Sequence, residues 1–310
     1  MPLPEALQGR LSLPAIAAPM FLVSGPELVI EACKAGVLGT FPSLNQRTTG
    51  GYAEWLARIR EALEAFPGAA PFGVNLIVNR TNARLEPDLK ATVEARVPLV
   101  ITSLGANAEV VQAVHGYGGL VFHDVITMRH AEKAAEAGVD GIVAVCAGAG
   151  GHGGTYSPFA FLAELRAAFP QTTLILSGAI TNGAQIAAAR LLGADLAYLG
   201  TRFIATRESM APDAYKRMVV EASGAKDIVY TPAFSGVHGN YLRASIVAAG
   251  LDPDNLPPRP EGGYDRERRK AWKDIWSAGQ GVGTIRDIPS VAELCARLRR
   301  EYREAAARLA

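Results

Sequence analysis

A single histidine, His152, stands within the glycine-rich stretch 147–154, and its imidazole is the side chain of that stretch best suited to chemistry. The apolar run 141–146 just before it has the length and β-branched content of a buried strand. Glycines let a backbone adopt positive φ and approach a flat ligand closely. The imidazole would then stand on a backbone surface that carries no competing side chains. A loose turn that carries a solvated histidine is the alternative, and the rest of the chain must decide between the two.

The same stretch resembles a dinucleotide-binding loop, because Gly148, Gly150 and Gly153 have the spacing G-x-G-x-x-G. That motif requires a helix that begins at the third glycine and an acidic residue about 20 positions later. Here the next helix is expected to begin only at residues 157–158, and the strand after it ends without an acidic residue. The pattern therefore disfavours a Rossmann-type site.

The composition is that of a globular chain with a large core, because 49% of its 310 residues are hydrophobic. The formal net charge of +1 gives no reason to expect nucleic acid or an acidic membrane surface as a partner. Cys33, Cys146 and Cys295 are far apart and odd in number, which argues against a disulfide framework or a zinc site. The chain opens with no signal-peptide pattern, and no apolar run approaches the roughly 18 residues of a membrane span. We therefore expect a cytoplasmic protein.

Short apolar runs alternate with helical patterns over the first two thirds of the chain. The runs lie at residues 13–20, 37–41, 72–78, 99–102, 120–123, 141–146, 174–176 and 196–199. Strands that alternate with helices predict an α/β fold with a parallel sheet buried on both faces. Right-handed crossovers between so many strands favour closure into a (β/α)8 TIM barrel.

Glycines and polar residues mark where the helices between these strands begin and end. Gly36, Gly138 and Gly193 each follow a helical pattern at the position that favours a left-handed residue. Ser24, Asn182 and Ser290 are expected to cap the helices that follow them. Ser24 and Ser290 each have a glutamate three residues later, as in a capping box.

Residues 208–264 break the alternation of strands and helices. They hold an amphipathic helical pattern near residues 212–222 and a proline-rich turn at 253–260. We expect a small, mostly helical domain here, inserted over the mouth of a barrel formed by residues 1–207. Residues 265–310 are expected to supply a second glycine-rich loop and a last helix that returns to the barrel.

Side chains at the carboxyl ends of barrel strands face the active site. The residues expected there are Met20, Asn75, Ser103, His123, the stretch 146–152 with Gly150, Gly151 and His152, and then Ser177, Gly178, Gly200 and Thr201. The segments 177–179 (Ser177, Gly178, Ala179) and 199–201 (Leu199, Gly200, Thr201) follow the last two strands, where barrels commonly bind a phosphate through backbone amides. Ordinary βα turns are the alternative for both segments.

A phosphate site beside a bare glycine floor suits FMN, whose ring would lie across the mouth with His152 above it. The amide of Asn75 carries donors and acceptors that can pair with the pyrimidine edge of a flavin, although a strand-end cap is the alternative. His238 competes with His152 for the catalytic role, and His123 is interpreted as a packed, hydrogen-bonded residue. His115 and His130 lie on expected helices and are interpreted as surface residues. No metal is expected, because no His, Cys and carboxylate ligands converge.

The order and spacing of these motifs resemble the nitronate monooxygenase family, formerly called 2-nitropropane dioxygenases. The matching segments cover nearly the whole chain and are 18–20, 73–75, 149–153, 177–178, 200–206 and 278–280. The resemblance implies a TIM barrel with non-covalent FMN that oxidises alkyl nitronates with O2 to a carbonyl compound and nitrite. It also implies that His152 is catalytic and that flavin binds at Asn75, Gly150, Gly178, Tyr198, Leu199, Gly200 and Thr201.

Three positions depart from the patterns of the resembled proteins. The monooxygenase class has Gln and Glu before the histidine, where this chain has Val145 and Gly148. A related quinone-reductase subgroup has Lys after the histidine of the fifth strand, where this chain has Asp124. The subgroup, and with it the electron donor, stays open.

Our hypothesis is that His152 holds the nitronate and acts as the base when a neutral nitroalkane must lose its α-proton. One alternative is an FMN-dependent reductase that transfers electrons from NADH to quinones or enoyl thioesters. Another is a flavin or phosphate-ligand binding protein without catalysis. The expected partners are a small-molecule substrate and O2, and a homodimer is left open.

Overall fold

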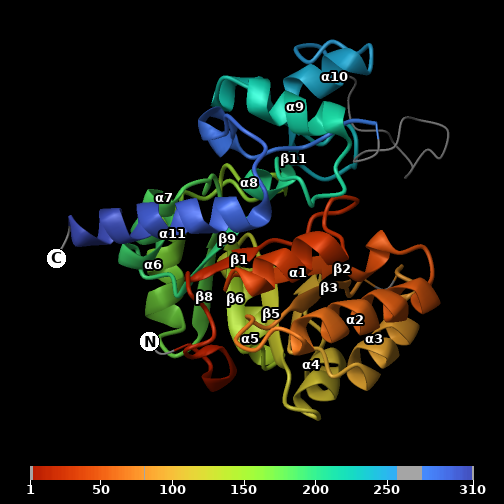
Figure 1. Cartoon of the computed structure of the whole chain (residues 1–310). Coiled ribbons are helices and arrows are strands. Elements are labelled where there is room, and N and C mark those ends of the chain that lie inside the picture. Colours follow the sequence, from red (N-terminus) through yellow and green to blue (C-terminus); the bar gives the residue numbers. More distant parts are fainter. Residues whose placement is uncertain (1–2, 80, 257–273, 309–310) are drawn as a thin grey trace.

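The computed structural model describes residues 3–79, 81–256 and 274–308, and a closed barrel of parallel strands lies at its centre (Figure 1). The barrel strands are β1 (Ala15–Ala17), β2 (Leu38–Pro42), β3 (Gly73–Ile77), β4 (Leu99–Ser103), β5 (Leu120–Val125), β6 (Gly141–Val145), β8 (Thr173–Ser177) and β9 (Leu196–Leu199). They follow one another in that order, and pairing of β1 with β9 closes the ring. The predicted TIM barrel is therefore confirmed.

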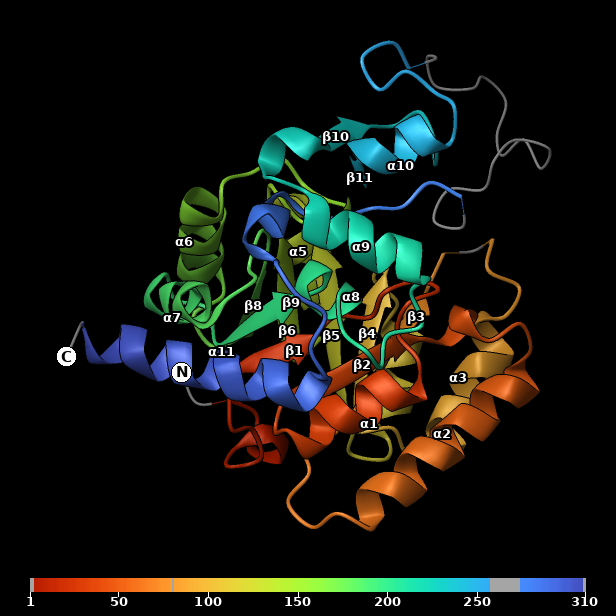
Figure 2. The ribbon, with the colours of Figure 1, turned by 45° about the horizontal axis from the view of Figure 1, so that its top comes forward.

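Helices between the strands pack on the outside of the barrel (Figures 1 and 2). They are α1 (Pro26–Lys34), α2 (Thr49–Glu64), α3 (Leu85–Glu94), α4 (Ala108–His115), α5 (Met128–Glu136), α6 (Pro158–Ala168) and α7 (Gly183–Leu191). The short α8 (Thr201–Ile204) follows β9 and lies at the mouth of the barrel, where it contacts α9 (Asp213–Glu221). The last helix, α11 (Val291–Ala307), packs against α7 and α1. None of the described helices has an apolar stretch long enough to cross a membrane.

The predicted helix ends are mostly confirmed. Gly36, Gly138 and Gly193 have φ of 76°, 84° and 100°, and capping boxes are present at Asn182 and Ser290. The prediction for residue 24 is wrong, because α1 has its N-cap at residue 25 without a side-chain bond. The buried hydroxyl of residue 24 instead accepts from the backbone N–H of residue 20 at 3.0 Å. This serine therefore stabilises the turn after β1 rather than the helix.

A layer of apolar side chains fills the barrel interior and forms the floor beneath its mouth. The layer consists of Ile16, Leu38, Leu99, Ile101, Phe122, Val143, Ile175 and Leu196, all fully buried. Because side chains of a strand alternate in direction, residues two positions further along face the same space one layer higher. Asp124, Val145, Ser177 and Tyr198 occupy such positions, and all four line the cavity described below.

Residues 208–256, here called the covering segment, lie over the barrel, in the upper part of Figure 1. The segment contains α9 (Asp213–Glu221), β10 (Ile228–Thr231), β11 (Gly239–Leu242) and α10 (Arg243–Ala248). The two helices agree with the expected helical character, whereas the two strands were not anticipated. They form a three-stranded antiparallel sheet with the short strand β7 (Gly151–His152), which belongs to the glycine-rich stretch.

Part of the predicted domain organisation falls on residues that the structure does not describe. The expected boundary at residues 264 and 265 and the end of the proline-rich turn lie outside the described residues. The three-part division of the chain therefore stays a prediction.

Candidate functional site

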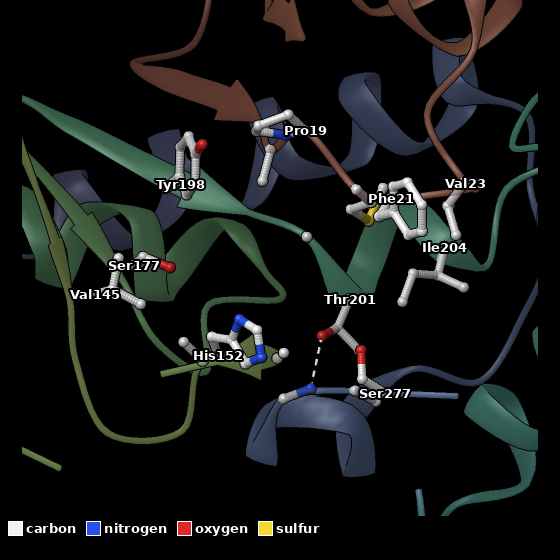
Figure 3. A pocket seen from close by; sticks show the side chains of 18 of the residues that line it. Pro19, Phe21, Val23, Val145, His152, Ser177, Tyr198, Thr201, Ile204 and Ser277 are labelled. Carbon is white, nitrogen blue, oxygen red and sulfur yellow. Dashed lines mark hydrogen bonds between the residues drawn. The ribbon is translucent and has the colours of Figure 1, made fainter. Parts of the chain in front are cut away.

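A cavity of about 520 Å³ opens at the carboxyl ends of the barrel strands, beneath the covering segment. Its volume lies in the range of small-molecule and cofactor sites. Figure 3 shows the imidazole of His152 among side chains from the ends of β6, β8 and β9. The predicted site residues that line it are Met20, Asn75, Gly150, Gly151, His152, Ser177, Gly178, Ala179, Tyr198, Gly200 and Thr201. Leu199 does not line it, because its buried side chain packs in the core between the barrel and the helices.

His152 lies in a strand rather than in the turn that its sequence suggested. Its partner in the antiparallel pairing of β7 with β11 is Gly239, and Gly151 pairs with Asn240. A φ of 72° at Gly151 turns the chain into this strand, a conformation that glycine adopts without strain. The imidazole borders the cavity and is exposed to it, and partial desolvation by the surrounding protein lowers its pKa. The side chain is therefore biased toward neutral imidazole, the form that can accept a proton.

The remaining histidines lie away from the cavity lining. His123 is buried with Nδ1 2.7 Å from the hydroxyl of Thr102, and burial lowers its pKa to about 4. The ring of His238 lies 5.1 Å from that of Tyr230 in the covering segment. His115, at the end of α4, has its Nε2 2.9 Å from a carboxylate oxygen of Asp140, and His130 is exposed on α5. Among the described residues, no group of three or more His, Cys, Asp or Glu is placed to hold a metal ion.

The glycine-rich stretch is held by a second loop, which runs from residue 277 into the 3-10 helix η4 (Gln280–Thr284). The N–H of Gln280 donates to the carbonyl of Gly148 at 2.9 Å, and the N–H of Gly279 donates to Thr201 Oγ1 at 2.8 Å. A Cβ at Gly150 would lie 2.9 Å from the nitrogen of Gly279. Because Cβ atoms essentially never come that close to backbone, only glycine fits at residue 150. Residues 278–280 belong to the segments that resemble the nitronate monooxygenase family, but their place in the site was not expected from the sequence.

Two neutral loops follow the last strands of the barrel, where a phosphate site was predicted. Gly178 and Ala179 have positive φ of 141° and 55°, so the loop after β8 turns sharply at the cavity. The loop after β9 passes through Gly200 directly into α8. No Lys or Arg is present among the described residues that line the cavity. An anion bound here would therefore depend on backbone N–H groups and hydroxyls.

Asn75 lies inside β3, not at its end, and its side chain is turned into the barrel mouth. Its amide nitrogen Nδ2 donates to the carbonyl of Ile101 at 3.0 Å and to Ser103 Oγ at 2.7 Å. Since a carbonyl can only accept, the contact with Ile101 fixes which end of the amide carries the hydrogens. Both donors are thus used within the protein, and Asn75 offers the cavity its acceptor oxygen Oδ1.

Asp124 lines the cavity, although from the sequence it stood out only as a departure from a family pattern. The hydroxyl of Ser103 donates to its carboxylate, and burial raises the pKa of Asp124 to about 6. Burial also raises the pKa of Tyr198, and the negative charge of Asp124 adds to that rise. The position could have been found from strand alternation, because Asp124 follows the interior residue Phe122 by two positions.

The covering segment contributes directly to the cavity wall. Tyr215 of α9 lines the cavity, donates a hydrogen bond to the carbonyl of Ser277, and stacks on Trp276 at a centroid distance of 5.0 Å. Ser277 also lines the cavity (Figure 3). The covering segment and the second loop thus form one wall, opposite the barrel floor.

Comparison with known proteins identifies the class to which this site belongs. The sequence model of the family described as nitronate monooxygenase matches residues 83–252. The nitronate monooxygenase of Paraburkholderia phytofirmans is 30% identical over 94% of this chain and 92% of its own length. This chain belongs to the nitronate monooxygenase family. It is therefore an enzyme, a flavin-dependent oxidoreductase of the nitronate monooxygenase type, as predicted.

Solved structures agree with this assignment. The nitroalkane oxidase of Streptomyces ansochromogenes has a TM-score of 0.80, is 25% identical, and covers 99% of this chain and 100% of its own. FabK from Thermotoga maritima also has a TM-score of 0.80, at 23% identity over 98% of this chain and 96% of its own. The latter likeness shows the shared barrel fold.

Proposed function

We propose that this protein binds FMN in the cavity and oxidises alkyl nitronates with O2 to a carbonyl compound and nitrite. The observation that carries the proposal is His152, held on a glycine floor at the mouth of a barrel of the nitronate monooxygenase family. The imidazole borders the same cavity as the two neutral loops suited to a phosphate. One cavity thus combines a base, an anion site and room for a flat ring.

The residues present fit FMN in their chemistry. The loops at Gly178 and Gly200 would hold the phosphate through backbone N–H groups, and the N-terminus of α8 begins beside them. Asn75 Oδ1 would accept a hydrogen bond from the one N–H donor of the pyrimidine edge, since both amide hydrogens of Asn75 are already used. Gly150, Gly151 and Met20 would border the ring. Bound FMN supplies the electron transfer between the nitronate and O2.

His152 then has two roles that depend on the substrate. For a neutral nitroalkane, its neutral imidazole takes the α-proton, and the lowered pKa keeps the imidazole unprotonated at neutral pH. For a nitronate no proton has to be removed, and His152 positions the anionic nitro group. Asp124 lines the same cavity and adds a negative charge there above its pKa of about 6.

An anaerobic mixing experiment tests the proposal. The purified protein is loaded with FMN and mixed without O2 with propyl-2-nitronate or with NADH, while the flavin absorbance is followed. We expect bleaching by the nitronate and none by NADH. Bleaching by NADH alone would move the protein to the quinone or enoyl-thioester reductases. A protein that takes up no FMN would overturn the cofactor assignment and the phosphate site with it.

The location in the cell also remains a proposal. Cys33, Cys146 and Cys295 are all buried and unpaired, which fits the reducing cytoplasm that we propose. The homodimer left open from the sequence stays untested.

A further inference from the structure

Ser235 of the covering segment contacts the catalytic imidazole. Its Oγ lies 2.9 Å from His152 Nε2 and 2.9 Å from the carbonyl oxygen of Val237. The hydroxyl of Tyr241 in β11 donates to the same Oγ at 3.2 Å. Ser235 precedes β11, the strand that pairs with β7, so the contact and the sheet belong to one arrangement. The hydroxyl thus meets three polar partners at once.

Counting hydrogens determines what passes between Ser235 and His152. A serine hydroxyl has one hydrogen to donate and two lone pairs that accept. The carbonyl of Val237 can only accept, so the hydroxyl hydrogen is used there. One lone pair accepts from Tyr241, and the other faces His152 Nε2. A hydrogen bond across that contact therefore requires the hydrogen to be on Nε2.

We infer that Ser235 is a positioning residue that holds His152 in the tautomer with hydrogen on Nε2, which makes Nδ1 the nitrogen that accepts the substrate proton. The part that concerns the substrate rests on the proposed function. In that step the α C–H bond of the nitroalkane breaks, the proton moves to Nδ1, and the electron pair stays on the substrate as the nitronate. The imidazolium that forms keeps its Nε2–H bond to Ser235.

Proton transfer makes the contact with Ser235 stronger. Hydrogen bonds from a charged donor are shorter and roughly twice as strong as neutral ones, so Ser235 stabilises the imidazolium more than the neutral ring. Among the described residues, the titratable groups near β7 include Tyr230, His238 and Tyr241 from the covering segment, and Asp124 lines the same cavity. Removing the hydroxyl should therefore make His152 a weaker base without changing any charged neighbour.

Nitrogen NMR tests the tautomer directly, without substrate. The FMN-loaded protein is labelled with ¹⁵N in its histidines, and His152→Gln assigns the signals of residue 152. In the wild type we expect a protonated Nε2 and an unprotonated Nδ1. S235A should raise the population with hydrogen on Nδ1, and S235T should restore the wild-type pattern. A wild-type ring with hydrogen on Nδ1, or unchanged populations in S235A, would overturn the inference.

Kinetics with a matched control test the consequence for catalysis. We expect S235A to lower kcat/KM for nitroethane by about three- to tenfold, the effect of one net hydrogen bond, with a smaller loss for ethylnitronate. The acid limb of the pH profile for nitroethane should move to lower pH. S223A is the control, since that hydroxyl, in the same segment, donates to Asp227 at 2.8 Å and does not line the cavity.

Two results separate the inference from the proposed function. Equal losses on both substrates with an unmoved acid limb would show that Ser235 only maintains the fold, which overturns its positioning role. A wild-type protein that oxidises neither substrate would refute the proposed function, and the NMR measurement would still decide the tautomer.

Discussion

Gly150→Ala is expected to weaken FMN binding by about 5- to 150-fold. The added Cβ would lie 2.9 Å from the nitrogen of Gly279, 3.1 Å from the carbonyl carbon of Ala278 and 3.2 Å from Thr201 Oγ1. Two of these neighbours are backbone atoms, so the second loop must move, and the bond of Gly279 to Thr201 at 2.8 Å moves with it. Overpacking of this kind costs about 1–3 kcal/mol, which corresponds to the stated range because 1.4 kcal/mol is tenfold.

Quenching of FMN fluorescence on titration with the FMN-free protein measures this effect. The cost falls on FMN binding because Gly150, Gly279 and Thr201 all line the cavity. Gly50→Ala in α2 is the matched control, since a Cβ there meets nothing closer than Thr48 Oγ1 at 4.0 Å. Urea unfolding of each variant separates a general loss of stability from a local change. If Gly150→Ala binds FMN with wild-type affinity, the glycine-rich stretch is not part of the flavin site.

His152→Gln should lower kcat/KM for neutral nitroalkanes by about 10²- to 10⁴-fold, the range of a general base, and lower it less for nitronates. Oxygen uptake measures both, and equal losses would remove the base role. Burial raises the pKa of Asp124 from 3.8 to about 6, so between these values the folded state keeps a proton that the unfolded state has lost. The contribution of Asp124 to the free energy of unfolding should therefore fall as the pH rises from 4 to 6, and D124N should abolish that fall. Urea unfolding of wild type and variant across this range tests it, and the comparison cancels the opposite contribution of His123, whose pKa is lowered to about 4. Each methylene added to the substrate tail should raise kcat/KM about fourfold, from about 0.8 kcal/mol per buried CH2. The apolar side chains expected to bury the tail are Phe21, Leu44, Ile77 and Leu104. A flat series from nitroethane to nitrohexane would contradict this assignment.

The barrel was predictable because local signals and the global fold agree. Each strand is a short apolar run, and glycines such as Gly36, Gly138 and Gly193 end the helices with positive φ, as their positions indicated. The cavity lining was predictable for the same reason. Carboxyl ends of parallel strands meet at one end of a barrel, so Ser103, Ser177 and their neighbours come together although they are far apart in the sequence.

Long-range pairing was not predictable from the sequence. The strand β7 has only two residues, too few to show a periodic pattern, and its partner β11 lies in the covering segment. The prediction of a mostly helical cover missed β10 and β11 because their eight residues are divided by a loop rich in turn formers. Ser235 lies in that loop, and nothing in its neighbouring residues indicates that its hydroxyl meets His152.

The position of the His152 imidazole, which we propose to be catalytic, depends on segments outside the barrel strands. On one side β7 pairs with β11 of the covering segment, and on the other the glycines before it contact the loop at Gly279. The barrel supplies Asp124 and the two loops that we propose to bind a phosphate, whereas the covering segment supplies Ser235 and β11, the strand that pairs with β7. A displacement of the covering segment would therefore move His152 through β11 and Ser235, and it would also move Tyr215 in the cavity wall. We therefore expect substitutions at Ser235 to change the proposed proton abstraction more than FMN binding, because Ser235 contacts the imidazole and is not among the residues that line the cavity.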